Sequence, residues 1–495
     1  MGGLVRGMDP STTSQAPEKD ADAARILSGP LAFEVLRFGG PLALGMALQT
    51  TFNLADAYLI ARLPAAEVGA AVGALGMCDQ VTALGTIISY GISTATAVVL
   101  SQQKGAGDQA GIVKTTYQSF LIIFALSLLF ALLGMFGSGF VVRSVIGAKG
   151  AVADVGEQYL RVMVGGSFSI FLLLHFSNLQ RALGSAKTPV LLMVLGNIIN
   201  VVLAVVLVFG DGPAPGFLSF GAPIARALHI PRMGMMGAAW ATIISRSMVL
   251  VPNAILAMRR FRMAVPRGVH AHPDVQEMRR VLSLAWPSST QFFLRIAATL
   301  LVNSLVARFY TTDTDQTAST AMGLVFRLDT LALFVAMGWG SGAQTFVGQN
   351  LGAGNPERAY RAGLLATAYQ SITGAMVIAL VFLRGPSILR FFGDEPHALA
   401  MGVTYLRDVA PSYIPLGIGV TLGGAIVGSG ATRTALVTDA CVIALVQLPL
   451  ALISAWALHA DIGWLFRSVT AANIGFCLAY LVVYTRRGWL TPRKA

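Results

Sequence analysis

The feature of this sequence that most limits its fold is a series of long apolar runs that continues from one end of the chain to the other. A helix needs about 20 apolar residues to cross a bilayer, and about twelve runs reach that length. Hydrophobic residues make up 55% of the 495 positions and charged residues only 12%, whereas soluble domains carry about 25% charged residues. We therefore expect an all-α integral membrane protein. The expected spans are 36–61, 67–101, 112–141, 154–183, 187–210, 233–258, 281–309, 317–347, 358–384, 398–428, 433–457 and 464–485.

The chain contains an internal repeat, which decides how these spans are arranged. "EQYLRVMV" at 157–164 resembles "VTYLRDVA" at 403–410, and "LIARL" at 59–63 resembles "LVARF" at 305–309. The matches keep one order and a spacing of about 246 residues, which indicates duplication. An even number of spans per repeat gives both copies the same orientation. We expect two pseudo-symmetric six-helix bundles with a cleft between them, which is the geometry of a transporter.

The repeat and the charge pattern divide the chain. The expected parts are a flexible cytosolic tail at 1–30, an N-terminal six-helix lobe at 31–258, a basic cytosolic linker at 259–280, a C-terminal six-helix lobe at 281–485 and a cytosolic tail at 486–495. Lys and Arg concentrate in alternate loops, so the linker and both termini are expected in the cytoplasm of a multi-pass inner (plasma) membrane protein. The basic residues behind the net charge of +12 are then expected to contact anionic lipid headgroups rather than nucleic acid. We expect a monomer.

The loops between spans carry glycine motifs with a structural explanation. In "KGAGDQA" and "LGAGNPERA" the glycines permit tight turns, and Asp108 or Asn355 can cap the next helix. No GxxxxGK[ST] stretch exists in the sequence, so no ATPase site is expected in this chain. Transport is then secondary, or powered by another subunit. We expect no cofactor other than a coupling ion and no metal site.

One carboxylate lies inside an apolar run, in "TFNLADAYLIARL". An Asp at the centre of a membrane helix costs about 2.5–3.5 kcal/mol, so such residues usually face a partner or a wet cavity. Asp56 is therefore a candidate for ion coupling. A structural, hydrogen-bonded carboxylate is the alternative. Pro41, in the same helix, removes a backbone hydrogen bond and can permit a bend.

Other polar and aromatic residues inside the spans are candidates for the relay and the substrate cavity. Asp79 is either part of the same relay or a solvated cleft residue. The charged residues of the C-terminal lobe can attract a carboxylate-bearing substrate or form a structural salt bridge; they are Arg295, Arg327 and Asp329. Phe292, Tyr90 and Trp339 can line a cavity for flat apolar rings, or can face lipid and neighbouring helices.

The series "FGGPLALGMALQTTFNLADAYLIA", "SQQKGAGDQA", "LQRALGSAKTP", "GAAWATIIS" and "TFVGQNLGAGNPERA" resembles the multidrug and toxic compound extrusion (MATE) family over about residues 33–485. The resemblance implies a twelve-helix antiporter that exports amphipathic organic compounds in exchange for protons or sodium. Asp56 matches the first-helix Asp of ion-coupled members, Asn200 a fifth-helix Asn, and Thr242 a sixth-helix Thr. Two positions depart from the pattern: Ala204 replaces an Asp, and Arg295 replaces a Glu.

The choice of ion follows from the available ligands. Sodium prefers several oxygen ligands, and Asp56 with Asn53, Asn200 and Thr242 can offer some, although Ala204 supplies none. One carboxylate is enough for a proton relay, which favours protons over sodium. A lipid-linked-sugar flippase of the same broader superfamily is the alternative, and it needs a strongly basic groove. A membrane-embedded enzyme is more remote, because no GxSxG, HExxH or paired carboxylates occur.

Overall fold

The structure, a computed structural model, describes residues 21–212, 214, 216–260, 272–312, 315–392, 395–457 and 461–490. The expected tail at 1–20, most of the basic linker, 261–271, and residues 491–495 lie outside the described residues. In the N-terminal half the main helices are α1 (Ala21–Ser28), α2 (Leu31–Ala61), α3 (Ala65–Gly105), α4 (Gln109–Phe140), α5 (Gly150–Gly165), α6 (Ser167–Ala182), α7 (Lys187–Phe209), α8 (Gly221–Ala227) and α9 (Met235–Arg260).

The C-terminal half repeats this order. Its helices are α10 (Val275–Phe309), α11 (Thr317–Gly352), α12 (Pro356–Phe392), α13 (Pro396–Val409), α14 (Tyr413–Gly428), α15 (Thr432–Val442), α16 (Leu448–Leu452) and α17 (Ile462–Thr485), with π-helical turns at Ile443–Gln447 and Ile453–Ala457. The described residues contain 12 helical segments long and apolar enough to cross a membrane. Each overlaps an expected span, and the described part of the chain is helical without a strand. The predicted fold class is confirmed.

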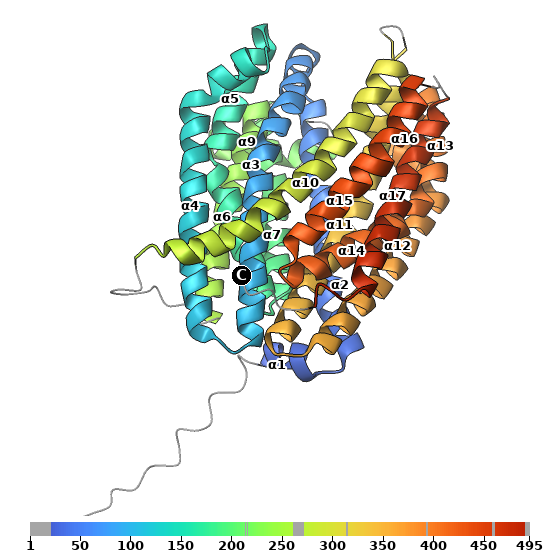
Figure 1. Cartoon of the computed structure of the whole chain (residues 1–495). Helices are drawn as coiled ribbons and strands as arrows, with labels where there is room; N and C mark the ends of the chain where they lie inside the picture. Colours follow the sequence, from blue (N-terminus) through green and yellow to red (C-terminus); the bar gives the residue numbers. More distant parts are fainter. Residues whose placement is uncertain are drawn as a thin grey trace, which may run out of the picture.

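The helices form two bundles that stand side by side, one from α3–α9 and one from α11–α17 (Figure 1). Equivalent pairs pack in both. In the first bundle α6 packs against α3 and α9, and in the second α14 packs against α11 and α17. Shared helix packing in both halves is what a duplicated chain predicts.

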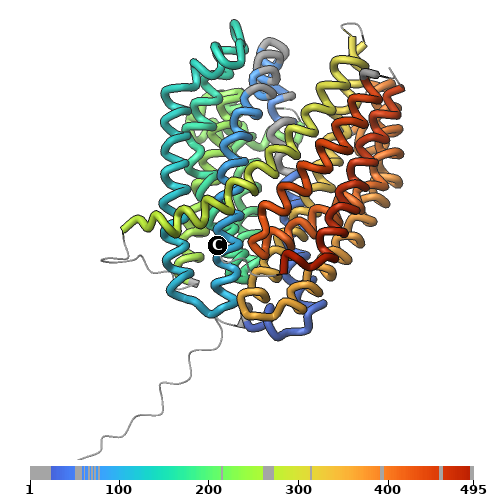
Figure 2. The backbone as a smooth tube through the Cα atoms, in the orientation of Figure 1, coloured from blue at the N-terminus to red at the C-terminus, as the bar shows by residue number. Residues whose placement is uncertain are grey.

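The first helix of each half contacts both bundles. Helix α2 packs against α11 and α12 as well as α7, and α10 packs against α3 and α4 as well as α15. Figures 1 and 2 show α10 running obliquely from one bundle to the other. We call α2 and α10 the crossing helices.

Hydrogen bonds hold the N-terminal end of each crossing helix to the opposite half. Before α2, the Arg358 guanidinium of α12 donates to the carbonyl oxygens of Ile26 (3.3 Å) and Gly29 (2.6 Å). Before α10, the Gln118 amide of α4 donates to the carbonyl oxygen of His272 (3.0 Å) and accepts from the backbone N–H of Asp274 (3.0 Å). Each half is therefore hydrogen-bonded to the start of the other half's crossing helix.

Both bundles meet at the lower end in Figure 1, which we call the sealed end; it carries the loops after α3, α6, α11 and α14. The Gln102 amide of α3 donates to the carbonyl oxygen of Gly428 at 3.3 Å. The Gln349 amide of α11 donates to the carbonyl oxygen of Ala182 at 2.8 Å. These bonds are related by the repeat, because each glutamine caps the last carbonyl of a helix in the other half.

Two glycines allow the backbones at the sealed end to approach closely. A Cβ on Gly105 would lie 1.9 Å from the carbonyl oxygen of Gln349, and a Cβ on Gly352 would lie 2.0 Å from that of Gln102. Both distances are shorter than any non-bonded contact allows. Glycine is therefore required at both equivalent positions for this packing.

The loops at the sealed end turn where the glycine motifs predicted. Gly107 and Gly354 have φ values of +73° and +75°, and Gly184 and Gly430 have +99° and +89°. Side chains with a Cβ rarely adopt this left-handed region. Asp108 caps α4 as expected, since its Oδ1 accepts from the backbone N–H of Gly111 at 2.8 Å.

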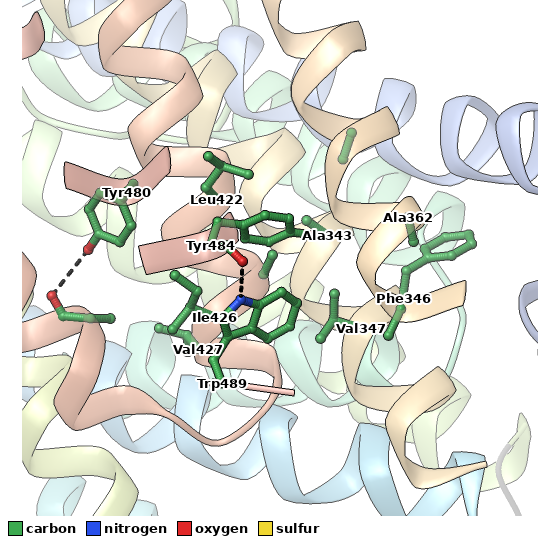
Figure 3. Packing of buried hydrophobic residues seen from close by; sticks show 14 of the residues in the cluster. Ala343, Phe346, Val347, Ala362, Leu422, Ile426, Val427, Tyr480, Tyr484 and Trp489 are labelled. Carbon is green, nitrogen blue, oxygen red and sulfur yellow. Dashed lines mark hydrogen bonds between the residues drawn. The ribbon is translucent and has the colours of Figure 1, made fainter. Parts of the chain in front are cut away.

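The second bundle is held by a buried apolar cluster between α11, α12, α14 and α17 (Figure 3). Phe346, Leu422 and Tyr484 are among its fully buried members. Trp489, after the end of α17, folds back so that its indole N–H donates to the carbonyl oxygen of Tyr484 at 3.0 Å. Close packing of this kind makes the bundle a rigid body on which a site can be built.

Candidate functional site

A cavity of about 380 Å³ lies inside the second bundle, between α10, α11, α13, α14 and α17. We call it the C-bundle cavity. Ligand pockets usually have volumes of about 300–1,000 Å³ and mainly apolar walls with a few polar groups. This wall is mainly apolar, and its aromatic members are Phe292, Phe326, Phe334, Tyr405, Tyr413 and Phe476. Two predicted charged residues, Arg295 and Asp329, also line it.

Asp329 is held in the cavity wall by two tyrosines of the neighbouring segment. The Tyr405 hydroxyl donates to Oδ2 at 2.5 Å, and the Tyr413 hydroxyl donates to Oδ1 at 2.6 Å. Both tyrosines are buried. Hydrogen bonds to an ionised acceptor are short and strong, so the pair fixes the orientation of the carboxyl group. The sequence suggested Asp329 but not its pairing with these two tyrosines, which lie 76 and 84 residues away.

Arg295 forms an ion pair with Asp439 of α15. Its Nε lies 2.5 Å from Oδ2, and its Nη2 lies 3.2 Å from Oδ1. The side chain of Asp439 is fully buried. The Tyr480 hydroxyl also donates to Asp439 Oδ1 at 2.5 Å, and the Gln291 amide donates to the Tyr480 hydroxyl at 3.0 Å. The charge of Arg295 is therefore compensated inside the bundle, as in the salt-bridge alternative.

Asp439 is a residue that the sequence reasoning missed. It lies inside the expected span 433–457, so it is an intramembrane carboxylate by the same criterion that selected Asp56. Its signal was present in the sequence. Its pairing with Arg295 was not, because the two residues are 144 positions apart on separate helices.

A second, smaller cavity of about 70 Å³ lies where the two bundles meet, between α3, α10, α11 and α14. Tyr90 and Phe292 both line it, with ring centroids 4.9 Å apart. Arg295, Phe292 and Met337 line both this inter-bundle cavity and the C-bundle cavity. The structure thus brings Tyr90, Phe292, Arg295 and Asp329 to two adjoining cavities.

Two predicted cavity residues lie elsewhere. Trp339 is 1% exposed, stacks on Tyr369 with centroids 5.6 Å apart, and donates from its indole N–H to Thr373 Oγ1 at 3.0 Å. It fills the contact between α11 and α2, where a Cβ on Gly39 would meet its ring at 2.5 Å. Arg327 is half-buried on α11 and is absent from the wall of the C-bundle cavity.

Two of the four predicted ion-coupling residues lie in the first bundle. Asn200 of α7 and Thr242 of α9 are both buried. Ser245, one turn after Thr242, donates to Asn200 Oδ1 at 3.4 Å, and Thr242 Oγ1 donates to the carbonyl oxygen of Ala238 at 2.9 Å. The side chains of Asn53 and Asp56 lie outside the described residues, although the backbone of α2 is helical there.

The remaining candidates are Asp79 and Pro41. Asp79 is exposed on α3, in contrast to the buried Asn200 and Thr242. Helix α2 continues through Pro41 from Leu31 to Ala61. Gly40, just before this proline, has no atom within 4 Å of its Cβ position, whereas Gly39 packs against the ring of Trp339.

Twelve spanning helices in two related bundles, with an apolar cavity in one bundle and a second cavity between them, define a membrane transporter. The MatE family profile matches residues 41–206 and again residues 287–453. The chain belongs to the MATE family of multidrug efflux transporters. The two matched segments start 246 residues apart, as the repeat predicted.

Curated relatives match most of the chain. The probable multidrug resistance protein YpnP of Bacillus subtilis is 28% identical over 433 residues, which cover 87% of this chain and 90% of that protein. The FAD transporter of Shewanella oneidensis is 26% identical over 442 residues, covering 88% and 90% respectively. A probable multidrug resistance protein, NorM of Thermotoga maritima, is 23% identical over 424 residues, covering 85% of each chain.

Solved structures show the same fold. A crystal structure of MATE in complex with MaL6 superposes with a TM-score of 0.83 at 20% identity, covering 95% of this chain and 99% of that chain. An outward-facing conformation of a multidrug resistance MATE family transporter gives a TM-score of 0.82 at 20% identity, with the same coverage. These matches and the relatives are transporters, so the expectation that the chain is no enzyme is confirmed.

Proposed function

We propose that this transporter is a secondary antiporter that exports amphipathic organic compounds, or a secreted natural product, in exchange for protons. The C-bundle cavity carries this proposal, because it combines about 380 Å³ of mainly apolar space with an oriented carboxylate, Asp329. An amphipathic molecule needs both kinds of surface. The names of two relatives, a probable multidrug resistance protein and an FAD transporter, fit the transport of organic compounds.

The coupling ion is proposed to be the proton, bound by Asp56 of α2 in the N-terminal half. Ala204 is fully buried on α7, one turn after Asn200. Its side chain supplies no oxygen ligand, and this disfavours a sodium site. Protonation would neutralise the carboxylate and lower the cost of keeping it away from water. A ligand shifts a conformational equilibrium only as far as it binds the two states differently. A titrating carboxylate whose surroundings change between states meets that condition.

We further propose that the protein lies in the inner (plasma) membrane as a monomer, with the sealed end and both termini in the cytoplasm. The support is the concentration of Lys and Arg in the loops expected on that side. These basic residues would contact anionic headgroups. A conformation closed at the sealed end then opens to the opposite side.

The test is efflux from proteoliposomes under an imposed pH gradient, run beside a sodium gradient at constant pH. Asp56→Asn keeps the side-chain size but cannot titrate, so we expect proton-driven export to fall to the level of empty liposomes. Asp154→Asn is the matched control, since it removes an exposed carboxylate of the same half that lines neither cavity, and it should retain proton-driven export. Full proton-driven export by Asp56→Asn would exclude the proposed role. Export driven by sodium alone would reverse the choice of ion.

A further inference from the structure

Arg181, near the end of α6, is a buried cation without a counterion. Its side chain is 7% exposed, and its Nε atom is enclosed without a hydrogen-bond acceptor. In the part of the chain that the structure describes, this side chain forms no ion pair and no hydrogen bond. Arginine cannot be deprotonated in proteins, and a buried charge without a partner is costly. The unpaired charge therefore favours an anion that comes from outside the chain.

The repeat places Arg181 at the level of the inter-bundle cavity. The two glutamine bonds at the sealed end cap the carbonyl oxygens of Ala182 and Gly428, which are equivalent in the two halves. Arg181 and Val427 each precede these residues by one position, so they are equivalent too. Val427 lines the inter-bundle cavity. The first half thus carries a cation where the second half presents an apolar side chain to this cavity.

Tyr90 connects Arg181 with the inter-bundle cavity. It lines the cavity, and it interacts electrostatically with both Arg181 and Arg295. The charge of Arg295 is compensated by the fully buried Asp439, so of these two cations only Arg181 contributes an excess charge beside the tyrosine. Buried charges are screened much less than exposed ones. An anion in the cavity would therefore be attracted by Arg181.

We propose that the exported compound is an organic anion whose carboxylate or phosphate group binds in the inter-bundle cavity and is neutralised by Arg181. A guanidinium group suits this role, because its planar fork matches the oxygens of a carboxylate or a phosphate. The proposal rests on the transport function proposed above and names the class of substrate for the same two cavities. Arg181 is not among the residues that the sequence analysis singled out.

The two cavities divide such a compound into an anionic end and an apolar body. The inter-bundle cavity, of about 70 Å³, holds one small group, and the C-bundle cavity, of about 380 Å³, holds the larger body. One molecule can occupy both, because Phe292, Arg295 and Met337 line both. Asp329, in the wall of the larger cavity, repels an anion. The anionic end is therefore directed towards Arg181, and the aromatic wall of the C-bundle cavity contacts the body.

The experiment compares two dyes that share a flat three-ring system and differ in charge, the anion fluorescein and the cation rhodamine 123. Binding to the purified full-length protein is followed by fluorescence anisotropy. Arg181→Gln removes the charge and keeps a polar side chain. Ser341→Asp adds a carboxylate to the lining of the inter-bundle cavity and leaves Arg181 in place. Arg384→Gln, the matched control, removes an exposed charge of α12 that lines neither cavity.

We expect Arg181→Gln to weaken fluorescein binding about tenfold, since a hydrogen bond to a charged group contributes about that factor. It should not weaken the binding of rhodamine 123. Ser341→Asp should also weaken fluorescein binding, through repulsion, and it tests the anion site even where Arg181→Gln is unstable. Arg384→Gln should leave the affinity for both dyes unchanged. Unfolding midpoints without dye show that each variant is folded.

Three results would overturn the proposal: no saturable fluorescein binding by the unchanged protein, undiminished fluorescein binding by Arg181→Gln, or an equal loss of both dyes in that variant. Dye binding needs no ion gradient, so it is independent of the efflux test with Asp56→Asn. Proton-driven export of rhodamine 123 by a protein that does not bind fluorescein would refute the anion and leave the antiport standing. Fluorescein binding that depends on Arg181, without proton-driven export, would refute the antiport and support the anion site.

Discussion

The two halves of this transporter differ most where their helices are otherwise equivalent. In the N-terminal half, α2 and α7 are joined by a neutral bond, in which the Asn197 amide donates to Gln49 Oε1 at 3.2 Å. In the C-terminal half, the matching helices α10 and α15 are joined by the ion pair of Arg295 and Asp439. Arg295 stands 246 residues after Gln49. The two halves thus share their helix contacts, while one carries an amide pair and the other a charged pair at this contact.

This difference suggests a division of roles. The C-terminal half encloses the cavity of about 380 Å³ beside its charges. In the first bundle, Asn200, Thr242 and Ser245 form an uncharged polar cluster. Buried ion pairs contribute little net stability, but separating their partners is costly, so the pair resists separation of the two helices that hold it. We expect the second bundle to move as a more rigid unit.

The largest effect should follow from breaking the charged contact alone. Asp439→Ala leaves Arg295 without its buried partner, which costs about 3–5 kcal/mol of unfolding free energy. Asn197→Ala, at the neutral contact, should cost about 1 kcal/mol. The measurement is denaturant unfolding of the purified proteins. Combining Arg295→Met with Asp439→Leu should recover most of the loss. Similar losses for Asp439→Ala and Asn197→Ala would show that the two contacts are energetically alike.

A smaller effect should come from the sealed end, where the halves agree. Gly105→Ala and Gly352→Ala each place a methyl group against opposing backbone, and such overpacking costs about 1–3 kcal/mol. We expect both to separate the halves equally, seen as a longer distance between spin labels at Ala106 and Arg361. Gly323→Ala, a helical glycine with no atom within 4 Å of its Cβ position, is the control. A change in only one of the two variants would contradict the symmetry.

The smallest effect concerns the contacts that hold the N-terminal ends of the crossing helices to the opposite half. Lys114 Nζ lies 2.6 Å from Asp274 Oδ2, and this bond lowers the pKa of the Asp274 carboxyl below its usual range. A carboxyl group whose pKa is lowered in the folded state stabilises the fold at pH values above its unfolded-state pKa of about 3.9. That stabilisation is lost as the pH falls through the folded-state pKa. Asp274→Asn should therefore lower the unfolding midpoint at pH 7.

The difference between Asp274→Asn and the unchanged protein should begin to shrink as the pH falls below about 4 and should continue to shrink through the lowered folded-state pKa. The Arg358 anchor of the other crossing helix uses backbone carbonyl oxygens. Arg358→Gln should therefore lower the midpoint by an amount that does not change over the same range. Thermal scans from pH 7 to pH 3 distinguish the two. A difference for Asp274→Asn that persists undiminished at pH 3 would rule out the carboxylate as its source.

How much of this could be predicted from the sequence depends on the range of the interactions. The twelve spans were predictable because each is a local run of apolar residues. The turns at Gly107 and Gly354 were predictable because a left-handed residue favours glycine. The partners of Arg295 and Asp329 were not, since they lie on helices far along the chain. A single sequence gives the apolar length of a helix but not the neighbour that it faces.

The same reasoning applies to the crossing helices. Periodicity predicts that 36–61 and 281–309 are helices, and the repeat predicts that they are equivalent. Neither signal shows that each of these two helices packs against the opposite half. The placement of Trp339 followed from that contact, since its ring fills the space left by Gly39 on α2. Its position in the α2–α11 contact depends on tertiary packing that has no local signature.

The crossing helices also make each half structurally incomplete without the other. Helix α10 covers a face of α3, and α2 covers a face of α11, so each half completes its surface with an arm contributed by the other. In subunit terms the chain has the construction of a two-fold dimer that has exchanged its N-terminal arms and then been joined end to end. Neither half, taken alone, would bury the surfaces that the borrowed arm covers.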